Sequence, residues 1–260
     1  MKRLTIVSWF TMENNLIIVK NLEKNYHDLK TEIEAVKDVS FSVKKNEFVS
    51  IVGPSGCGKS TILSILAGLE KKSDGDINLN SDLKVGYMLQ SDSLFSWRTI
   101  LENCLIGLEI ESNLTKKNVD YVVNLLKIYG LEEFMNKYPD SLSGGMRQRV
   151  ALIRTLATKP DILLLDEPLS KLDYQSRLTI GNDIYKIIKN EKKTAIMVTH
   201  DIAEAVSMSD RVIVLSRRPC VIKHIYEIKL NKNEDSLHNR YSKEFNTYYE
   251  KIWRDLDVQI

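Results

Sequence analysis

Short apolar runs separated by polar turns fill the first third of the chain, and they predict β-strands. The runs lie at residues 16–19, 39–43, 47–52, 77–79 and 85–89. Residues 44–46 make a tight polar connection between two of them, and Asn46 suits this place because asparagine tolerates a left-handed backbone. We therefore expect a β-rich N-terminal region, with a first amphipathic helix at residues 61–67.

After residue 144 the pattern changes to fully apolar runs that alternate with amphipathic segments of helical period. Strands are predicted at residues 162–165, 195–198 and 212–215, and helices at residues 145–158 and 174–190. Strands without a polar face need cover on both faces, which is the environment of a parallel sheet flanked by helices. We therefore predict an α/β fold.

Residues 92–142 separate these two regions and have the pattern of a mostly helical insert. Apolar side chains recur there at helical spacing: Val119, Val122, Val123 and Leu126. Gly130 stands where a helix would end, and a second, shorter helix is expected at residues 131–136.

Three parts are predicted along the chain: a leader at residues 1–13, the main domain at 14–235 and a helical tail at 236–260. Polar residues interrupt the short apolar stretch of the leader, and no small-residue cleavage site follows it, which argues against a signal peptide. We expect a poorly ordered leader, or translation from Met12. The tail carries one apolar stripe, so we expect a helix that docks on the domain: Phe245, Tyr249, Ile252 and Leu256.

The bulk composition bounds the class of protein. Of the 260 residues, 43% are hydrophobic and 28% are charged, and the net charge of +2 is too small to indicate a nucleic-acid partner. Cys57, Cys104 and Cys220 lie far apart, so we expect no disulfide scaffold and no zinc site, and a reducing cytosol as the setting. No apolar run approaches the roughly 20 residues that cross a bilayer, so we expect no membrane span.

The strand at residues 48–52 leads into a glycine-rich turn that fits the phosphate-binding pattern G-x-x-x-x-G-K-[ST]. Glycine permits backbone angles that turn successive N–H groups toward one anion, and the following helix adds its N-terminal amides. The lysine supplies a mobile positive charge, and the serine hydroxyl suits Mg²⁺. A chance glycine turn is the alternative. The expected nucleotide-binding residues are Gly53, Pro54, Ser55, Gly56, Cys57, Gly58, Lys59, Ser60 and Thr61.

Three other apolar strands also end in polar residues. Gln90 follows residues 85–89, the pair Asp166 and Glu167 follows residues 162–165, and His200 follows residues 195–199. Because the carboxyl ends of parallel strands share one edge of a sheet, we expect these residues to meet at the phosphate loop.

Each of these residues has a role that phosphoryl transfer requires. Asp166 would hold Mg²⁺ together with Ser60, Glu167 would be the general base for the attacking water, and Gln90 would position that water and the metal. His200 would donate a hydrogen bond to the γ-phosphate. The alternatives are a helix-capping pair for the two carboxylates and a core position for the histidine.

Residues 142–149 read Leu-Ser-Gly-Gly-Met-Arg-Gln-Arg, which resembles the LSGGQ-type signature of ABC (ATP-binding cassette) ATPases. The order of all the motifs matches that family over about residues 14–230. The resemblance implies an ABC ATPase fold: a P-loop NTPase core, an N-terminal antiparallel β subdomain and a helical insert subdomain. It also implies that ATP with Mg²⁺ is bound and hydrolysed. An ordinary serine cap followed by two glycines is the alternative for the signature.

The family resemblance also assigns residues to a second copy of the chain. In ABC ATPases two cassettes pair head to tail, so Ser143, Gly144 and Gly145 would contact the ATP of the partner cassette. Tyr26 would stack on the adenine, with core packing as its alternative. Asp173 belongs to a segment similar to the family's D-loop, residues 170–173, in which Lys171 replaces a usually small residue.

The segment at residues 90–100 resembles cassettes of bacterial importers for nitrate, aliphatic sulfonates, taurine, bicarbonate or thiamine-precursor pyrimidines, although Ser96 stands where proline is usual. The resemblance implies a homodimer at the cytoplasmic face of the membrane. It also implies a permease that docks near the Gln90 loop and the helical insert, and a separate solute-binding protein. Leu94, Phe95 and Trp97 are candidates for the docking surface, with core packing as the alternative. A soluble ABC ATPase acting on ribosomes or DNA, or an exporter cassette, is the competing hypothesis.

Overall fold

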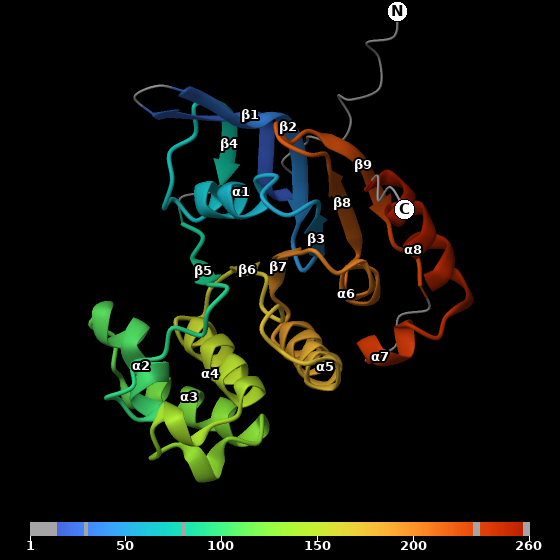
Figure 1. Ribbon diagram of the computed structural model, residues 1–260. Helices are drawn as coiled ribbons and strands as arrows, with labels where there is room; N and C mark the ends of the chain where they lie inside the picture. The colour runs from blue at the N-terminus through green and yellow to red at the C-terminus, as the bar shows by residue number, and fades with distance from the viewer. Residues whose placement is uncertain (1–14, 29–30, 80–81, 231–234, 257–260) are drawn as a thin grey trace, which may run out of the picture.

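The computed structural model describes residues 15–28, 31–79, 82–230 and 235–256, which form two β-sheets, helices packed on both faces of the larger sheet, and a helical lobe (Figure 1). The predicted leader lies outside the described residues. Among the described helices, none is both long and apolar enough to cross a membrane. The three cysteines are free and buried.

The N-terminal sheet has three antiparallel strands in the order β2-β1-β4. They are β1 (Asn15–Asp28), β2 (Thr31–Lys44) and β4 (Asp74–Leu79). Val19 pairs with both Phe41 and Ile77, so the strands share an apolar face. The first two strands run well beyond the predicted apolar runs, because backbone pairing continues across register shifts at polar residues.

The larger sheet has six strands in the order β5-β6-β7-β3-β8-β9. Five of them are parallel, as predicted: β5 (Val85–Met88), β6 (Ile162–Asp166), β7 (Thr194–Thr199), β3 (Phe48–Val52) and β8 (Arg211–Leu215). The antiparallel edge strand β9 (Ile222–Glu227) was not predicted, because its side chains are mostly exposed and its sequence lacks an apolar run.

Successive side chains of each central strand enter two different cores, as the alternation of a strand requires. Ile162 and Leu164 face the N-terminal sheet and α1 (Lys59–Leu66), whereas Leu163 and Leu165 face α4 (Gly144–Ala157) and α5 (Tyr174–Asn190). The larger sheet is therefore packed on both faces, and this packing fixes the edge that carries the candidate site.

The helical lobe contains α2 (Ile100–Ile110), α3 (Lys116–Ile128) and two 3₁₀ turns, Glu132–Phe134 and Pro139–Ser141. It packs on α4 (Figure 1). Gly130 has a φ of 73° and ends α3, as predicted, but the helix expected at residues 131–136 is reduced to the first of the 3₁₀ turns.

The last helices cover β8 and β9. Val212 and Val214 share a core with α6 (Ile202–Met208) and α8 (Lys243–Asp255). The predicted tail helix is confirmed: Phe245 and Ile252 are buried on its inner face. The short α7 (Ser236–Asn239) precedes it.

Candidate active site

The phosphate loop joins β3 to α1 through a backbone that requires glycine at two places. Gly56 has a φ of 71° and Gly58, the cap of α1, has a φ of 125°. A Cβ atom on Gly58 would lie 3.0 Å from the carbonyl oxygen of Ala35. The loop is therefore bent tightly under the N-terminal sheet, with the first turn of α1 directly behind it.

Lys59 is 5% exposed, and its ammonium lies against the first residues of the loop. The Nζ atom donates to the carbonyl oxygens of Gly53, at 2.9 Å, and Pro54, at 3.1 Å. An ammonium has three protons, so a third can go to a phosphate oxygen. A second cation also stabilises the loop. The guanidinium of Arg218 donates to the Gly56 carbonyl at 2.6 Å and 3.2 Å. Arg218 was not predicted from the sequence as part of the site.

Ser60 and Asp166 come together as predicted. The Ser60 hydroxyl donates to Asp166 Oδ1 at 2.9 Å, and the Tyr87 hydroxyl donates to Asp166 Oδ2 at 3.1 Å. Burial raises the pKa of Tyr87, so its hydroxyl stays protonated as a donor. Hydroxyl and carboxylate oxygens are the ligands that Mg²⁺ prefers, so this pair fits a magnesium-bound nucleotide. Tyr87 was missed, although it lies in the predicted strand before Gln90.

Glu167 lies where the ends of three strands meet. Its Oε2 atom is 3.3 Å from Gln90 Nε2 and 3.2 Å from His200 Nδ1. Its backbone is left-handed, with a φ of 44°, and its N–H donates to the Val198 carbonyl at 2.9 Å. Such a φ is strained for a residue with a side chain, and strain of this kind concentrates at functional sites.

Tyr26 lies beside the helix that follows the phosphate loop. The residue is 38% exposed, and its hydroxyl is 3.5 Å from Thr61 Oγ1. The ammonium of Lys24 lies 4.7 Å from the ring centroid and is held by Glu70 at 2.7 Å. Core packing does not account for so exposed a ring, and an exposed aromatic face near the loop is suited to stacking on a base.

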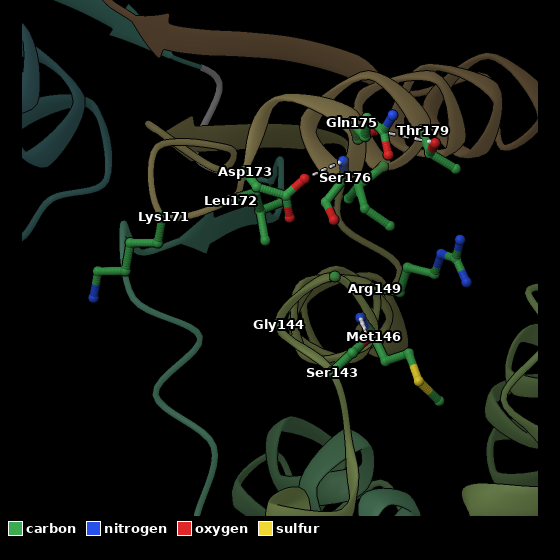
Figure 2. A pocket seen from close by; sticks show the side chains of 12 residues that line it. Ser143, Gly144, Met146, Arg149, Lys171, Leu172, Asp173, Gln175, Ser176 and Thr179 are labelled. Atoms are coloured by element: carbon green, nitrogen blue, oxygen red, sulfur yellow. Dashed lines mark hydrogen bonds between the residues drawn. The ribbon is translucent and has the colours of Figure 1, made fainter.

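The signature residues line a separate pocket of about 540 Å³ (Figure 2). Ser143 caps α4, since its hydroxyl accepts from the N–H of Met146, and Gly144 is exposed next to it. Gly145 is buried instead: a Cβ atom there would lie 2.8 Å from Ile180 Cδ1 of α5. The glycine pair therefore has two tasks, one at the surface and one in the contact between helices.

The expected D-loop forms the other side of this pocket. Figure 2 shows Leu172 and Asp173 across from Ser143 and Gly144. Asp173 caps α5 by accepting from the N–H of Ser176 at 3.0 Å, and hydrogen bonds from Ser176 lower the pKa of its carboxyl. In the described part of the chain, the phosphate loop contributes no lining residue to the pocket.

The loop after Gln90 is anchored to the helical lobe and exposes two aromatic rings. Phe95 and Trp97 have ring centroids 5.0 Å apart, and Trp97 is 71% exposed, whereas Leu94 packs against the core. The buried amide of Asn103 bonds both the N–H and the carbonyl of Phe95, at 2.7 Å and 3.0 Å. Core packing thus applies to Leu94 but not to Trp97.

Comparison with known proteins gives one consistent result. A family model described as "ABC transporter" matches residues 36–170. The chain is 42% identical to the uncharacterised ABC transporter ATP-binding protein YtlC of Bacillus subtilis, over 92% of this chain and 95% of that protein. It is 35% identical to the aliphatic sulfonates import ATP-binding protein SsuB of Bacillus cereus, over 85% of this chain and 90% of the relative.

A solved structure has the same fold. It is the dimeric, post-hydrolysis state of the ATP-binding cassette MJ0796 with ADP and Pi bound. The two chains are 32% identical, the TM-score is 0.70, and the match covers 82% of this chain and 99% of the other.

Proposed function

The chain belongs to the ABC transporter family and is an ATPase, and we propose that it energises an importer for a small organic anion such as an aliphatic sulfonate. The single observation that carries the catalytic part of this proposal is the position of Glu167. Its carboxylate meets Gln90 and His200 beside the Ser60–Asp166 pair, at the mouth of a phosphate loop.

In the proposed mechanism, the phosphate loop and Lys59 bind the phosphates, and the exposed ring of Tyr26 receives the adenine. Ser60 and Asp166 would hold Mg²⁺, which neutralises phosphate charge when bound. Glu167 accepts the proton of the attacking water through its carboxylate. The side-chain nitrogens of Gln90 and His200 both reach Glu167 Oε2, which orients that carboxylate.

Gln90 and His200 each use one side-chain nitrogen on Glu167, and each keeps one further polar atom for the substrate. Gln90 uses its amide nitrogen on Glu167, so its carbonyl oxygen remains available to the water or the metal. His200 uses Nδ1 on the carboxylate, which leaves Nε2 for the γ-phosphate, and both ring nitrogens donate at once when the imidazole is protonated. The roles proposed for both residues are therefore compatible with the contacts that they make with the base.

The active unit that we propose is a head-to-tail dimer, with ATP held between the phosphate loop of one copy and the signature of the other. Two observations support it. The exposed Ser143 and Gly144 stand at the N-terminus of α4, which has 14 residues and whose unpaired amides favour an anion. They line a pocket to which the described part of the phosphate loop contributes no residue. A dimer would bring these two half-sites together.

Phe95 and Trp97 are the proposed contact with a membrane permease, which would place the cassette at the cytoplasmic face of the membrane. Exposed aromatic rings are costly in water and common at protein interfaces. Asn103 makes hydrogen bonds to both backbone groups of Phe95, so a partner would meet a preformed surface. The relation to SsuB favours an aliphatic sulfonate among the candidate solutes.

The experiment that tests the catalytic proposal compares Glu167→Gln with Glu133→Gln, an exposed glutamate in the helical lobe. Loss of a general base costs a factor of about 10²–10⁴. We expect Glu167→Gln to bind ATP with unchanged affinity and to hydrolyse it at least about 100-fold more slowly, and Glu133→Gln to behave as wild type. Wild-type turnover by Glu167→Gln would remove Glu167 from the role of base.

A further inference from the structure

Arg177, in the first turns of α5, contacts two loops that the proposed mechanism treats separately. Its Nη2 atom donates to the carbonyl of Leu172, in the D-loop, at 3.2 Å. Its Nη1 atom is 3.5 Å from Asp201 Oδ2, and its Nε atom is 3.7 Å from Glu204 Oε1. Asp201 directly follows His200, so one guanidinium spans the D-loop and the turn that carries the histidine.

The turn at residues 199–201, here called the His200 turn, is fixed to the start of α6 on both sides of the histidine. On one side, the Thr199 hydroxyl donates to Glu204 Oε2 at 2.8 Å. On the other, Asp201 caps α6 by accepting from the N–H of Glu204 at 3.0 Å. The two carboxylates that Arg177 faces are therefore the two groups that hold this turn.

The D-loop is held at two points. Near its start, the N–H and hydroxyl of Ser170 donate to the Glu167 carbonyl at 3.2 Å and 3.0 Å. Near its end, Leu172 is bonded by Arg177. Lys171 lies between these points and lines the signature pocket (Figure 2). A molecule that enters this pocket and displaces the D-loop would therefore also shift Glu167, through Ser170. It would shift the His200 turn as well, through Arg177.

We propose that Arg177 is a positioning residue that couples the D-loop to the His200 turn, so that occupation of the signature pocket by a second copy stabilises the contact that His200 makes with Glu167. The inference rests on the proposed function, because it uses the roles given there to His200 and to the pocket. Within the described residues Arg177 makes polar contacts with Leu172, Asp201 and Glu204, so its removal should change turnover and leave nucleotide binding intact.

A guanidinium is suited to this task. It presents five N–H donors in a rigid planar fork, which a lysine ammonium on a flexible stem cannot reproduce. Here the fork makes hydrogen bonds to Leu172 and Asp201, and Glu204 lies within ion-pair range. The side chain of Glu204 is 4% exposed and that of Arg177 is 24% exposed, so water screens the contact weakly. The Arg177 guanidinium therefore fixes the positions of its neighbours in addition to balancing their charge.

The test measures kcat, KM for ATP and ATP affinity in the full chain for Arg177→Met and Arg177→Lys. Lys189→Met is the matched control, because Lys189 makes an ion pair from the far end of the same helix, with Asp210 at 3.2 Å. We expect Arg177→Met to lower kcat about tenfold, within the usual range of coupling between sites. ATP affinity should stay within about twofold of wild type, and Arg177→Lys should recover kcat only in part.

Three results would overturn the proposal: a kcat for Arg177→Met within about twofold of wild type, a parallel loss of kcat and ATP affinity, or an equal loss of kcat in Lys189→Met. If Arg177→Met does not fold, Arg177→Lys decides, because full activity in that variant excludes a need for the fork. Glu167→Gln is measured alongside. Retained turnover in Glu167→Gln contradicts the proposed function, whereas wild-type kcat in Arg177→Met with an inactive Glu167→Gln contradicts the coupling alone.

Discussion

Glu204 is expected to make the stability of this protein depend on pH, because it is an ionisable residue that is only 3% exposed. Burial and the neighbouring Asp201 raise the pKa of Glu204 from 4.5 to about 7, against the Thr199 hydroxyl and the cations Arg177 and Arg240, which lower it. The substitution Glu204→Gln keeps the size and the carbonyl oxygen of the side chain but removes the ionisation. It therefore isolates this one titration.

The direction in which stability changes with pH depends on which state, folded or unfolded, keeps the proton of Glu204. Below pH 4.5 the carboxyl is protonated in both the folded and the unfolded chain, and ionisation costs nothing. Between pH 4.5 and about 7 the unfolded chain releases the proton while the folded chain keeps it, so the free energy of unfolding falls as the pH rises. Each unit of difference between the folded and unfolded pKa corresponds to about 1.4 kcal/mol. The free energy of unfolding is therefore lower by about 3 kcal/mol above pH 7.

The assay is reversible urea unfolding of wild type and Glu204→Gln at pH 5, 6, 7 and 8, with Glu133→Gln as the exposed carboxylate-to-amide control. We expect the two proteins to be closest in stability at pH 5, and Glu204→Gln to gain about 3 kcal/mol relative to wild type by pH 8. A difference that is constant with pH would contradict a raised pKa. A wild type that gains on the variant as the pH rises would mean that Arg177 outweighs burial.

Three further outcomes test the site and its surfaces. Lys59→Ala should lose at least about tenfold in ATP affinity by calorimetric titration, because charged hydrogen bonds contribute about 1.5–3 kcal/mol; unchanged affinity would contradict the assignment of the phosphate loop. Gly58→Ala should cost about 1–3 kcal/mol of stability in urea unfolding, since its φ is 125° and its Cβ would press on a backbone carbonyl. Gly68→Ala shares a left-handed backbone, with a φ of 73°, but no described atom lies within 4 Å of the added Cβ, so it should cost less, and equal costs would contradict the steric argument. Trp97→Ala should change stability by less than about 0.5 kcal/mol but weaken co-purification with the permease, and a large loss of stability would return Trp97 to the core.

The elements that could be predicted from the sequence are those whose signal is local. A buried parallel strand is apolar along its whole length, and a phosphate loop needs its glycines and lysine within a few residues. The four functional strand ends followed from these signals, because adjacent parallel strands bring their carboxyl ends together. Asp166 and Glu167 therefore lie beside Ser60, Gln90 and His200, as expected.

The features that could not be predicted depend on partners far away in the chain. Tyr87 bonds Asp166 across 79 positions, and Arg218 bonds Gly56 across 162 positions. Nothing in the local pattern distinguishes such a tyrosine or arginine from an ordinary surface residue. The edge strand β9 was missed for a related reason, since it is held by backbone pairing with β8 and not by a run of apolar side chains.

The central claim is that each catalytic site is completed by the signature of a second copy, and the most direct measurement is the mass of Glu167→Gln with ATP by light scattering. We expect the mass to rise from the 29.9 kDa of one chain to twice that value, and to stay at one chain when Ser143→Arg is added to the same variant. A mass that remains at one chain in saturating ATP, or a dimer that forms equally well with Ser143→Arg, would contradict a shared site.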